Sequence, residues 1–377
     1  FLPLDPDTAA LRWPALQALG GGRLQRIDSL PEIQSVSRSH DHAPDSELAL
    51  VIATSGSEGS PKAVVHTHAS LAAAARASAH MLPLAPGDVW LDCLPLFHIG
   101  GQAILWRAFI AGAAVLLHEG FDADAVWQSI RHDDVTHISL VPAMLAQLLD
   151  RADCPPPPHL QAVLIGGATL SRPLWQRAVN AGWPLFVSYG MSETAAQIAT
   201  LPPGDDWHEG LVGRSLPGVA VTIAGDGRIH IGGPQLMHGY LDANGTASLG
   251  LIDGTFLSGD LGRIDDAGRL IVLGRADDML VSGGKNVHPQ EIEARLSQCP
   301  GIIDSAVTST PDPVWGDVIT ALVVGSGDTD AIDRWCRESL PDPFRPRRIV
   351  RVPALPRNTL GKLERKALPA LLAEDRP

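Results

Sequence analysis

The sequence predicts an α/β protein whose large N-terminal domain has parallel-rich sheets and a small β-barrel-like part, followed by a C-terminal α+β domain. The first observation is that apolar strand-like segments alternate with helix-like segments from residue 48 to residue 187. That order requires a parallel sheet with crossover connections. The second is a run of short β-like segments after residue 200, separated by turn pairs. The third is that helical and strand patterns mix again from residue 278 onward.

Length and composition restrict the possible classes of function. The chain has 377 residues, of which 45% are hydrophobic and 19% are charged. Such a chain is globular rather than disordered, and its length predicts about two to three domains. With 29 basic and 42 acidic residues, the formal net charge is −13. That charge opposes general binding to nucleic acids and to anionic membrane surfaces.

The cysteines and the apolar runs predict a cytoplasmic location. The 4 cysteines form no CxxC pair, so a reducing cytosol is expected rather than a disulfide framework or a zinc site. No uncharged apolar stretch reaches about 18 residues, so no membrane span is expected. Residues 1–13 also lack the basic region, apolar core and cleavage site of a signal peptide.

In the alternating half, residues 1–46 are predicted to be a lead-in with one or two helices. Residues 48–53 form the first apolar strand, of the kind that a sheet buried on both faces requires. Pro142 suits a helix start, where its missing N–H costs nothing. The predicted strands are 48–53, 89–93, 114–117, 137–141, 162–165 and 185–187, and the predicted helices are 69–81, 102–111, 123–132, 142–150 and 172–181.

The later elements are shorter. Antiparallel hairpins or a small barrel are predicted where turn pairs separate β-like runs. These pairs are Asp226-Gly227, Asn244-Gly245, Asp253-Gly254 and Ala267-Gly268. Beyond them, helices are predicted at 290–298 and 328–340 and strands at 303–307 and 318–324. The predicted domains are therefore 1–276 and 277–377.

The segment most informative about chemistry is TSGSEGSPK at residues 54–62. It follows an apolar strand and combines hydroxyl groups, two glycines and a lysine. Its backbone N–H groups can therefore wrap a phosphate while Lys62 neutralises charge. Its spacing differs from the Walker pattern, because proline precedes the lysine and alanine follows it. A flexible surface loop is the alternative, and the preceding strand and the Pro-Lys ending argue against it.

From this segment onward, the chain resembles the adenylate-forming superfamily, which contains acyl- and aryl-CoA synthetases, peptide-synthetase adenylation domains and luciferases. Residues 54–62 resemble its phosphate-binding signature, and five later motifs follow in the order of the family. These are LPLFHIGG at 94–101, SYGMSET at 188–194, SGDLGR at 258–263, GRADD at 274–278 and PRNTLGK at 356–362. Six motifs in the right order make the resemblance specific.

The resemblance implies a site for ATP and Mg²⁺. The ring of Tyr189 would stack on adenine, while Asp260 and Arg275 suit the ribose diol and the phosphates. Glu193 would hold Mg²⁺, a hard ion that prefers carboxylate oxygen. The residues expected to bind ATP or AMP are Thr54, Ser55, Gly56, Ser57, Glu58, Gly59, Lys62, Gly167, Ala168, Ser188, Tyr189, Gly190, Met191, Ser192, Asp260 and Arg275.

The resemblance also implies which residues handle the acid. His98 would line and gate the acyl pocket, although a lone histidine beside apolar residues is also typical of a structural role. Both His98 and Lys362 are expected to be catalytic residues, and Lys362 would stabilise the charge developing when a carboxylate attacks the α-phosphate. A solvated basic end of the chain is the alternative for Lys362. The acyl-pocket residues expected besides His98 are Gly166, Gly190 and Thr194.

A moving C-terminal domain is a further implication. Asp277 would be the hinge of a mobile domain that delivers Lys362 in one orientation and exposes a tunnel for coenzyme A in the other. Glycines at the tunnel would let the narrow pantetheine arm pass. The expected tunnel residues are Ser282, Gly283 and Gly284.

The implied reaction converts a carboxylate and ATP to acyl-AMP and pyrophosphate, and then transfers the acyl group to coenzyme A. The part before the first motif is short, and residues 137–145 (HISLVPAML) look like those of o-succinylbenzoate–CoA ligases of menaquinone biosynthesis. A succinylbenzoate carries a second carboxylate, which needs a cationic or hydroxyl partner when buried. The candidate partners are His98, Ser139, Thr194 and Arg214.

Three alternatives stay open. One is a benzoate-type or medium-chain acid–CoA ligase. Another is a stand-alone adenylation protein that loads the thiol of a carrier protein. The third is a degenerate binding module, against which the presence of Lys362, Glu193 and Asp260 argues. The expected partners are a carboxylic acid, ATP and coenzyme A rather than nucleic acid, with a carrier protein and a homodimer left open.

Overall fold

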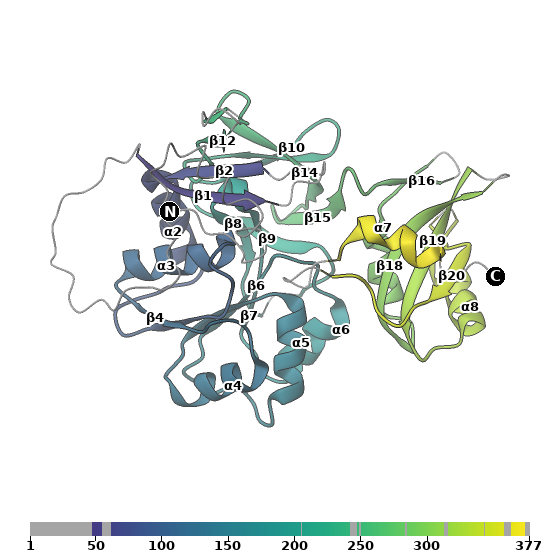
Figure 1. The fold of residues 1–377 in the computed structure, drawn as a ribbon, viewed down its shortest axis with the longest axis horizontal. Helices are drawn as coiled ribbons and strands as arrows, with labels where there is room; N and C mark the ends of the chain where they lie inside the picture. The colour runs from purple at the N-terminus through teal and green to yellow at the C-terminus, as the bar shows by residue number, and fades with distance from the viewer. Residues whose placement is uncertain are drawn as a thin grey trace, which may run out of the picture.

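A computed structural model describes most of the chain beyond residue 46. The described residues are 47–54, 62–204, 206–241, 247–248, 250–282, 285–312, 316–342, 344–357 and 363–373. The lead-in predicted at 1–46 lies outside them. Within the described residues the strands form sheets of eleven, four, three and two strands, and the three-stranded sheet lies to one side of the larger part (Figure 1).

The centre of the fold is a parallel sheet, as the alternating pattern predicted. Its strands lie in the order β4-β3-β5-β6-β7, and each neighbouring pair is parallel. The strands are β3 (Val89–Asp92), β4 (Ala114–Leu117), β5 (His137–Leu140), β6 (Ala162–Ile165) and β7 (Leu185–Met191). The crossover helices are α3 (Ile99–Ala111), α4 (Ala123–His132), α5 (Pro142–Arg151) and α6 (Arg172–Asn180).

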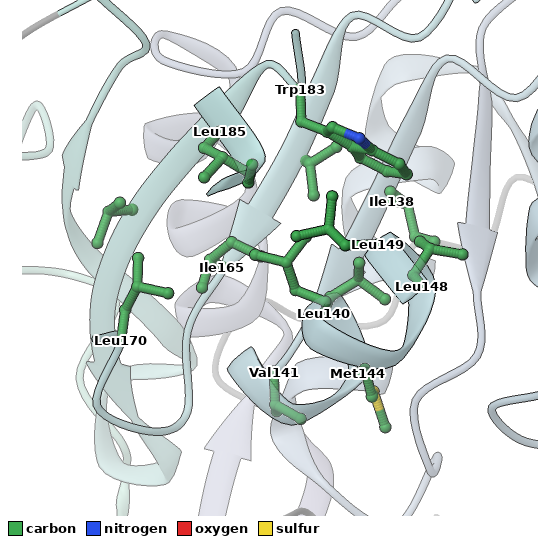
Figure 2. Close-up of a cluster of buried hydrophobic side chains, with 14 of the residues drawn as sticks. Ile138, Leu140, Val141, Met144, Leu148, Leu149, Ile165, Leu170, Trp183 and Leu185 are labelled. Carbon is green, nitrogen blue, oxygen red and sulfur yellow. The ribbon is translucent and has the colours of Figure 1, made fainter. Parts of the chain in front are cut away.

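Strand β6 shows why a strand of this sheet can be a continuous apolar run. Its residues Val163 and Ile165 belong to a core that also holds Leu148 of α5, and Figure 2 shows that core around Ile165 and Leu148. The alternate residues Ala162 and Leu164 pack into a second core with Ile104 of α3. Because successive strand residues point to opposite faces, helices on both sides leave no position for a polar residue.

The antiparallel strands predicted after residue 200 are present as hairpins. They are β8 (Ala196–Leu201), β9 (Leu211–Ser215), β10 (Ala220–Ile223), β11 (Arg228–Gly232), β14 (Thr255–Ile264) and β15 (Leu270–Arg275). The pairs Asp226-Gly227 and Ala267-Gly268 form the turns β10–β11 and β14–β15. Instead of a separate barrel-like part, hydrogen bonds join these strands to β7 in the eleven-stranded sheet. The predicted turn Asn244-Gly245 lies outside the described residues.

A small antiparallel sheet was not predicted. It has the order β1-β2-β12-β13, with β1 (Leu48–Thr54), β2 (Lys62–Thr67), β12 (Gly239–Leu241) and β13 (Ala247–Ser248). Residues 48–53 therefore do not belong to the parallel sheet. The prediction missed β2 because it took residues 54–62 as a loop leading directly to a helix. That helix, α2 (His68–Ala79), starts directly after β2, where Thr67 accepts a 3.1 Å hydrogen bond from the Ser70 backbone N–H.

The C-terminal part has the predicted α+β composition. Strand β19 pairs with β18 on one side and with β20 on the other. Its elements are β16 (Leu280–Ser282), β17 (Lys285–Val287), α7 (Pro289–Leu296), β18 (Ile302–Asp312), β19 (Gly316–Gly325), α8 (Thr329–Ser339), β20 (Arg348–Arg351) and α9 (Leu368–Ala373). The β16–β17 hairpin, β20 and α9 were not predicted. In the part of the chain that the structure describes, no helix has the length and apolar character to cross a membrane.

Candidate active site

The predicted motifs meet at one open cavity of about 2890 Å³. Strands β7, β14 and β15 line it from the large sheet, and α7 and residues 363–366 line it from the C-terminal part. The predicted site residues that line it are Thr54, Lys62, His98, Gly166, Gly167, Ala168, Ser188, Tyr189, Gly190, Met191, Ser192, Glu193, Asp260, Arg275 and Asp277. Segments more than 200 residues apart in sequence therefore share one cavity.

Part of the predicted site lies outside the described residues. These positions are Ser55, Gly56, Ser57, Glu58, Gly59, Gly283, Gly284 and Lys362. Ser282 is the last residue of β16, and the structure describes its backbone only.

A cluster of three polar side chains at the cavity suits a ribose. Asp260 and Arg275 face each other on β14 and β15, with Arg275 Nη1 3.5 Å from Asp260 Oδ1. The Tyr189 hydroxyl donates a 2.6 Å hydrogen bond to Asp260 Oδ2. Burial, reinforced by the Asp260 charge, raises the pKa of Tyr189 well above its ordinary value, so the phenol keeps its proton. The Asp260 carboxylate is thus held in place while facing the cavity.

The predicted hinge lies directly beside this cluster. Arg275 donates from Nε to Asp277 Oδ1 over 2.8 Å. The next residue, Asp278, forms an ion pair of 3.1 Å with Arg365 Nε. Arg365 also pairs with Glu293 of α7 at 2.7 Å. These contacts join the segment after β15 to α7 and to the C-terminal residues next to the last motif.

A second group of side chains at the cavity suits phosphate and metal. The Tyr240 hydroxyl donates a 2.9 Å hydrogen bond to Glu193 Oε1, and Lys62 Nζ lies 5.4 Å from the centroid of the Tyr240 ring. Thr54 Oγ1 donates to the carbonyl of Lys62 over 3.2 Å, and the two residues face each other in the β1–β2 pairing. Tyr240 lies outside all the predicted motifs. The signal that could have found it is that the chain has only 2 tyrosines.

Glu193 meets the requirements of a magnesium ligand. Its carboxylate lines the cavity near Lys62, and Mg²⁺ in nucleotide sites is held by one or two carboxylates together with phosphate oxygens. The backbone just before it is also held, since the carbonyl of Ser192 lies 2.7 Å from His66 Nε2. Burial lowers the pKa of His66 to about 4, so its ring is neutral and donates this hydrogen bond from Nε2.

Three glycines at the cavity are explained by the backbone, because a side chain at each position would clash or strain the chain. A Cβ on Gly190 would overlap the backbone of Ala196 on the neighbouring strand β8, so this glycine is needed for close strand contact. A Cβ on Gly166 would lie 2.8 Å from Ser188 Oγ, which donates to the Ile165 carbonyl. Gly167 has a φ of 77°, a left-handed conformation that favours glycine.

Two residues predicted for the acid end are not at the cavity. Thr194 is fully buried, and its Oγ1 donates to the Ala196 carbonyl over 2.8 Å and accepts from the Met191 N–H over 3.1 Å. Its hydroxyl therefore closes the turn after β7 and does not face the acyl pocket. Arg214 lies exposed on β9, outside the cavity lining.

His98 and Ser139, which were also predicted for the acid, do line the cavity. His98 immediately precedes α3, and its ring centroid is 4.6 Å from that of Phe97. Ser139 lines the cavity from β5, but its Oγ accepts a 3.2 Å hydrogen bond from Trp90 Nε1. Neither of these two side chains supplies a permanent positive charge to the cavity.

Arg107 is a cation at the cavity that sequence reasoning missed. It lines the cavity from α3 and is only 6% exposed. Its Nη2 donates to Gln197 Oε1 over 3.2 Å, and its guanidinium lies 5.3 Å from the centroid of the Trp90 ring. Among the described residues, no carboxylate pairs with it. The available signal was a single charge inside the apolar segment 103–117.

Comparison with known proteins identifies the family. Residues 13–241 match the model of the AMP-binding enzyme family, and residues 291–362 match that of the AMP-binding enzyme C-terminal domain. The chain belongs to the AMP-binding enzyme family. This confirms the predicted resemblance to adenylate-forming enzymes.

Curated relatives of this AMP-binding enzyme carry one name. It is 37% identical over 326 residues to a 2-succinylbenzoate–CoA ligase of Listeria monocytogenes serotype 4b (strain F2365), covering 86% of this chain and 70% of the relative. It is 34% identical over 372 residues to a 2-succinylbenzoate–CoA ligase of Bacillus licheniformis, covering 94% of this chain and 77% of the relative.

Solved structures of named synthetases are also similar to this chain. The o-succinylbenzoate CoA synthetase (MenE) from Bacillus subtilis, in complex with the acyl-adenylate intermediate OSB-AMP, has a TM-score of 0.77 and 34% identity, covering 85% of this chain and 68% of that one. The same synthetase with ATP and magnesium ion also has a TM-score of 0.77 at 34% identity, covering 85% and 69%. ATP-bound MatB from Rhodopseudomonas palustris has a TM-score of 0.77 at 28% identity, covering 88% and 69%.

Proposed function

We propose that this AMP-binding enzyme is an ATP-dependent, AMP-forming ligase that joins o-succinylbenzoate to coenzyme A. In the first step a carboxylate oxygen attacks the α-phosphorus of ATP, and the bond to pyrophosphate breaks. In the second step the thiol of coenzyme A attacks the acyl carbon and releases AMP. The relatives named 2-succinylbenzoate–CoA ligase and the structure that holds OSB-AMP support this reaction. A role in menaquinone biosynthesis, as predicted from the sequence, is part of this proposal.

Arg107 is the observation that carries the choice of acid. Burial lowers the pKa of Arg107 to about 10, so it is still charged at neutral pH. A buried charge without an opposite charge is costly to the fold. An acid with a second carboxylate would supply that charge when it binds at this end of the cavity. A simple benzoate or an alkanoate has no group for this purpose.

At the nucleotide end, the described side chains orient ATP. Asp260 accepts hydrogen bonds from the ribose hydroxyls, with Tyr189 and Arg275 holding its carboxylate in place. Glu193 would hold Mg²⁺, which supplies positive charge to the phosphates when bound. Lys62 adds a positive charge near the same position.

The C-terminal part completes the reaction in this proposal. Lys362 is the residue that stabilises charge on the α-phosphate during adenylation. The domains are 1–276 and 277–377 with Asp277 as the hinge, and the turn at 282–284 borders the path of the pantetheine arm. Support comes from the cavity, which residues of both parts line.

The substrate panel is the first test. The relative kcat/KM for o-succinylbenzoate, benzoate, hydroxybenzoates and octanoate is measured by acid-dependent release of pyrophosphate. We expect o-succinylbenzoate to be preferred by at least about a hundredfold, because a buried ion pair broken on one side typically costs 3 kcal/mol or more. A preference for benzoate would instead support the benzoate-type ligase, and a preference for octanoate would support the medium-chain ligase.

Variants of Arg107 connect this preference to the site. Arg107→Lys keeps the charge but loses the forked geometry, and Arg107→Met removes the charge at similar length. Both should lower kcat/KM for o-succinylbenzoate, Met more than Lys, and benzoate should be little affected. Arg131→Lys is the matched control, because Arg131 also lies over a tryptophan ring, at 5.9 Å from that of Trp127, but outside the cavity lining. Equal losses for both acids would refute the role of Arg107.

The acceptor and the setting of the enzyme complete the proposal. A carrier protein as acceptor is the alternative to coenzyme A, and comparing both thiols with preformed acyl-adenylate decides between them.

The four cysteines are all free thiols, in keeping with a reducing cytoplasm. A homodimer is the remaining candidate partner, and sedimentation of the purified chain determines its oligomeric state.

A further inference from the structure

Tyr240 touches two of the predicted motifs without belonging to either. Its hydroxyl donates to Glu193 Oε1 over 2.9 Å, and its ring lies below Lys62 Nζ at 5.4 Å. Strand pairing places it there, since Tyr240 on β12 faces Val64 on β2, two residues after Lys62. The small sheet therefore brings the end of the first motif and the glutamate of the third motif to one phenol.

The same sheet region holds the backbone on both sides of Glu193. His66 Nε2 donates to the Ser192 carbonyl over 2.7 Å, and the Met237 N–H donates to the Glu193 carbonyl over 2.9 Å. With its peptide held in this way, Glu193 keeps only the rotations of its own side chain. A glutamate side chain loses rotamer entropy when it is ordered, so a hydrogen bond that orders it in advance favours any ligand of its carboxylate.

The Tyr240 ring is itself held in position. It packs against the buried cluster that contains Met237 and Val64. A Cβ on Gly250 would lie within 2.7 Å of Met237 Cε and would overlap the Tyr240 ring, so glycine at that position leaves room for the ring. The hydroxyl is thus presented to Glu193 by a rigid ring with little freedom of its own.

We infer that Tyr240 is a positioning residue, which orients the Glu193 carboxylate for the divalent cation that accompanies ATP. The inference rests on the proposed function, in which Glu193 is the metal ligand. The hydrogen bond to Oε1 restricts the rotation of the Glu193 carboxylate. Hydrogen bonds to ligating carboxylates commonly change metal affinity by about 10- to 100-fold when they are removed.

The test measures metal binding rather than turnover. The dissociation constant of Mn²⁺ is measured by electron paramagnetic resonance in the complex with α,β-methylene-ATP, whose α–β bridge the reaction cannot break. Tyr240→Phe keeps the ring under Lys62 and removes only the hydroxyl. We expect it to weaken Mn²⁺ binding about tenfold, and to leave binding of the analogue in excess chelator unchanged.

Two further variants separate the possible outcomes. Tyr240→Leu also removes the ring under Lys62, and should additionally weaken the metal-free analogue. Glu193→Gln should weaken Mn²⁺ binding, and adding Tyr240→Phe to it should cause no further loss. Additive losses, or unchanged Mn²⁺ affinity in Tyr240→Phe, would overturn the inference and leave the ligase proposal intact. Failure of the wild-type enzyme to catalyse acid-dependent pyrophosphate exchange would defeat that proposal, while the Mn²⁺ titrations would still decide the role of Tyr240.

Discussion

Arg275 Nε donates a 2.8 Å hydrogen bond to Asp277 Oδ1. The same guanidinium lies 3.5 Å from Asp260, the residue assigned to the ribose. The side chain of the predicted hinge thus shares a partner with the nucleotide site. A nucleotide that draws Arg275 toward its ribose or phosphates would compete with Asp277 for that side chain.

The hinge prediction follows from this contact. Asp277→Pro fixes φ near −65° and removes the hydrogen bond, so rotation should be hindered. Acyl-adenylate should form and accumulate while acyl-CoA falls, as measured by chromatography of quenched single-turnover reactions. Asp277→Ala is the control, because it loses the hydrogen bond to Arg275 but leaves φ unrestricted. If Asp277→Pro turns over like Asp277→Ala, the pivot lies elsewhere.

Tyr189→Phe tests the ribose end. The change removes the 2.6 Å hydrogen bond to Asp260 and keeps the ring. A hydrogen bond to a charged group contributes about 1.5–3 kcal/mol, so AMP should bind about 10- to 100-fold more weakly by calorimetry. The melting temperature of the free protein serves as the control for folding. AMP affinity equal to that of the wild type would show that Asp260 is oriented by other groups.

Lys362→Ala tests the two half-reactions separately. The lysine is expected to act only in the adenylation orientation, so acid-dependent exchange of pyrophosphate into ATP should fall by orders of magnitude. Conversion of supplied acyl-adenylate by coenzyme A should be nearly unaffected. A similar loss in both assays would contradict the idea that the C-terminal domain works in two orientations.

Asp92 gives a prediction for stability against pH. It is fully buried at the end of β3, and its Oδ2 has no hydrogen-bond partner among the residues that the structure describes. Burial raises the pKa of Asp92 from 3.8 to about 7. Between these two values the unfolded chain loses the proton and the folded chain keeps it, so this group lowers stability as pH rises.

Chemical denaturation of Asp92→Asn at several pH values checks that sign. The variant should lack the contribution of Asp92, so its stability relative to the wild type should increase from pH 4 to pH 7, by at most about 4 kcal/mol, and level off above. The test is the change of this stability difference with pH and not its absolute value, because the asparagine amide also changes stability by an amount that does not depend on pH. Parallel curves for the two proteins would mean that Asp92 ionises normally in the folded state.

The parallel sheet shows how well local sequence patterns predict the strands and helices. Strands 114–117 and 162–165 and helix 123–132 occur where they were predicted. In β6, helices cover both faces, so every residue is apolar and the strand stands out from its neighbours. Strand β2 was missed because it directly follows the motif loop, and β20 because its sequence, RIVR, was taken as part of a basic tail.

The sequence by itself determined the family and the reaction class, because each motif is a short segment whose residue types serve one local task. It did not determine which side chains meet. Arg107 contacts Gln197 90 residues away, and Tyr240 contacts Glu193 47 residues away. Such contacts depend on strand order and on helices crossing between strands, which hydrophobic periodicity does not encode. Only the tertiary structure placed a buried cation at the cavity, and a phenol beside the carboxylate assigned to the metal.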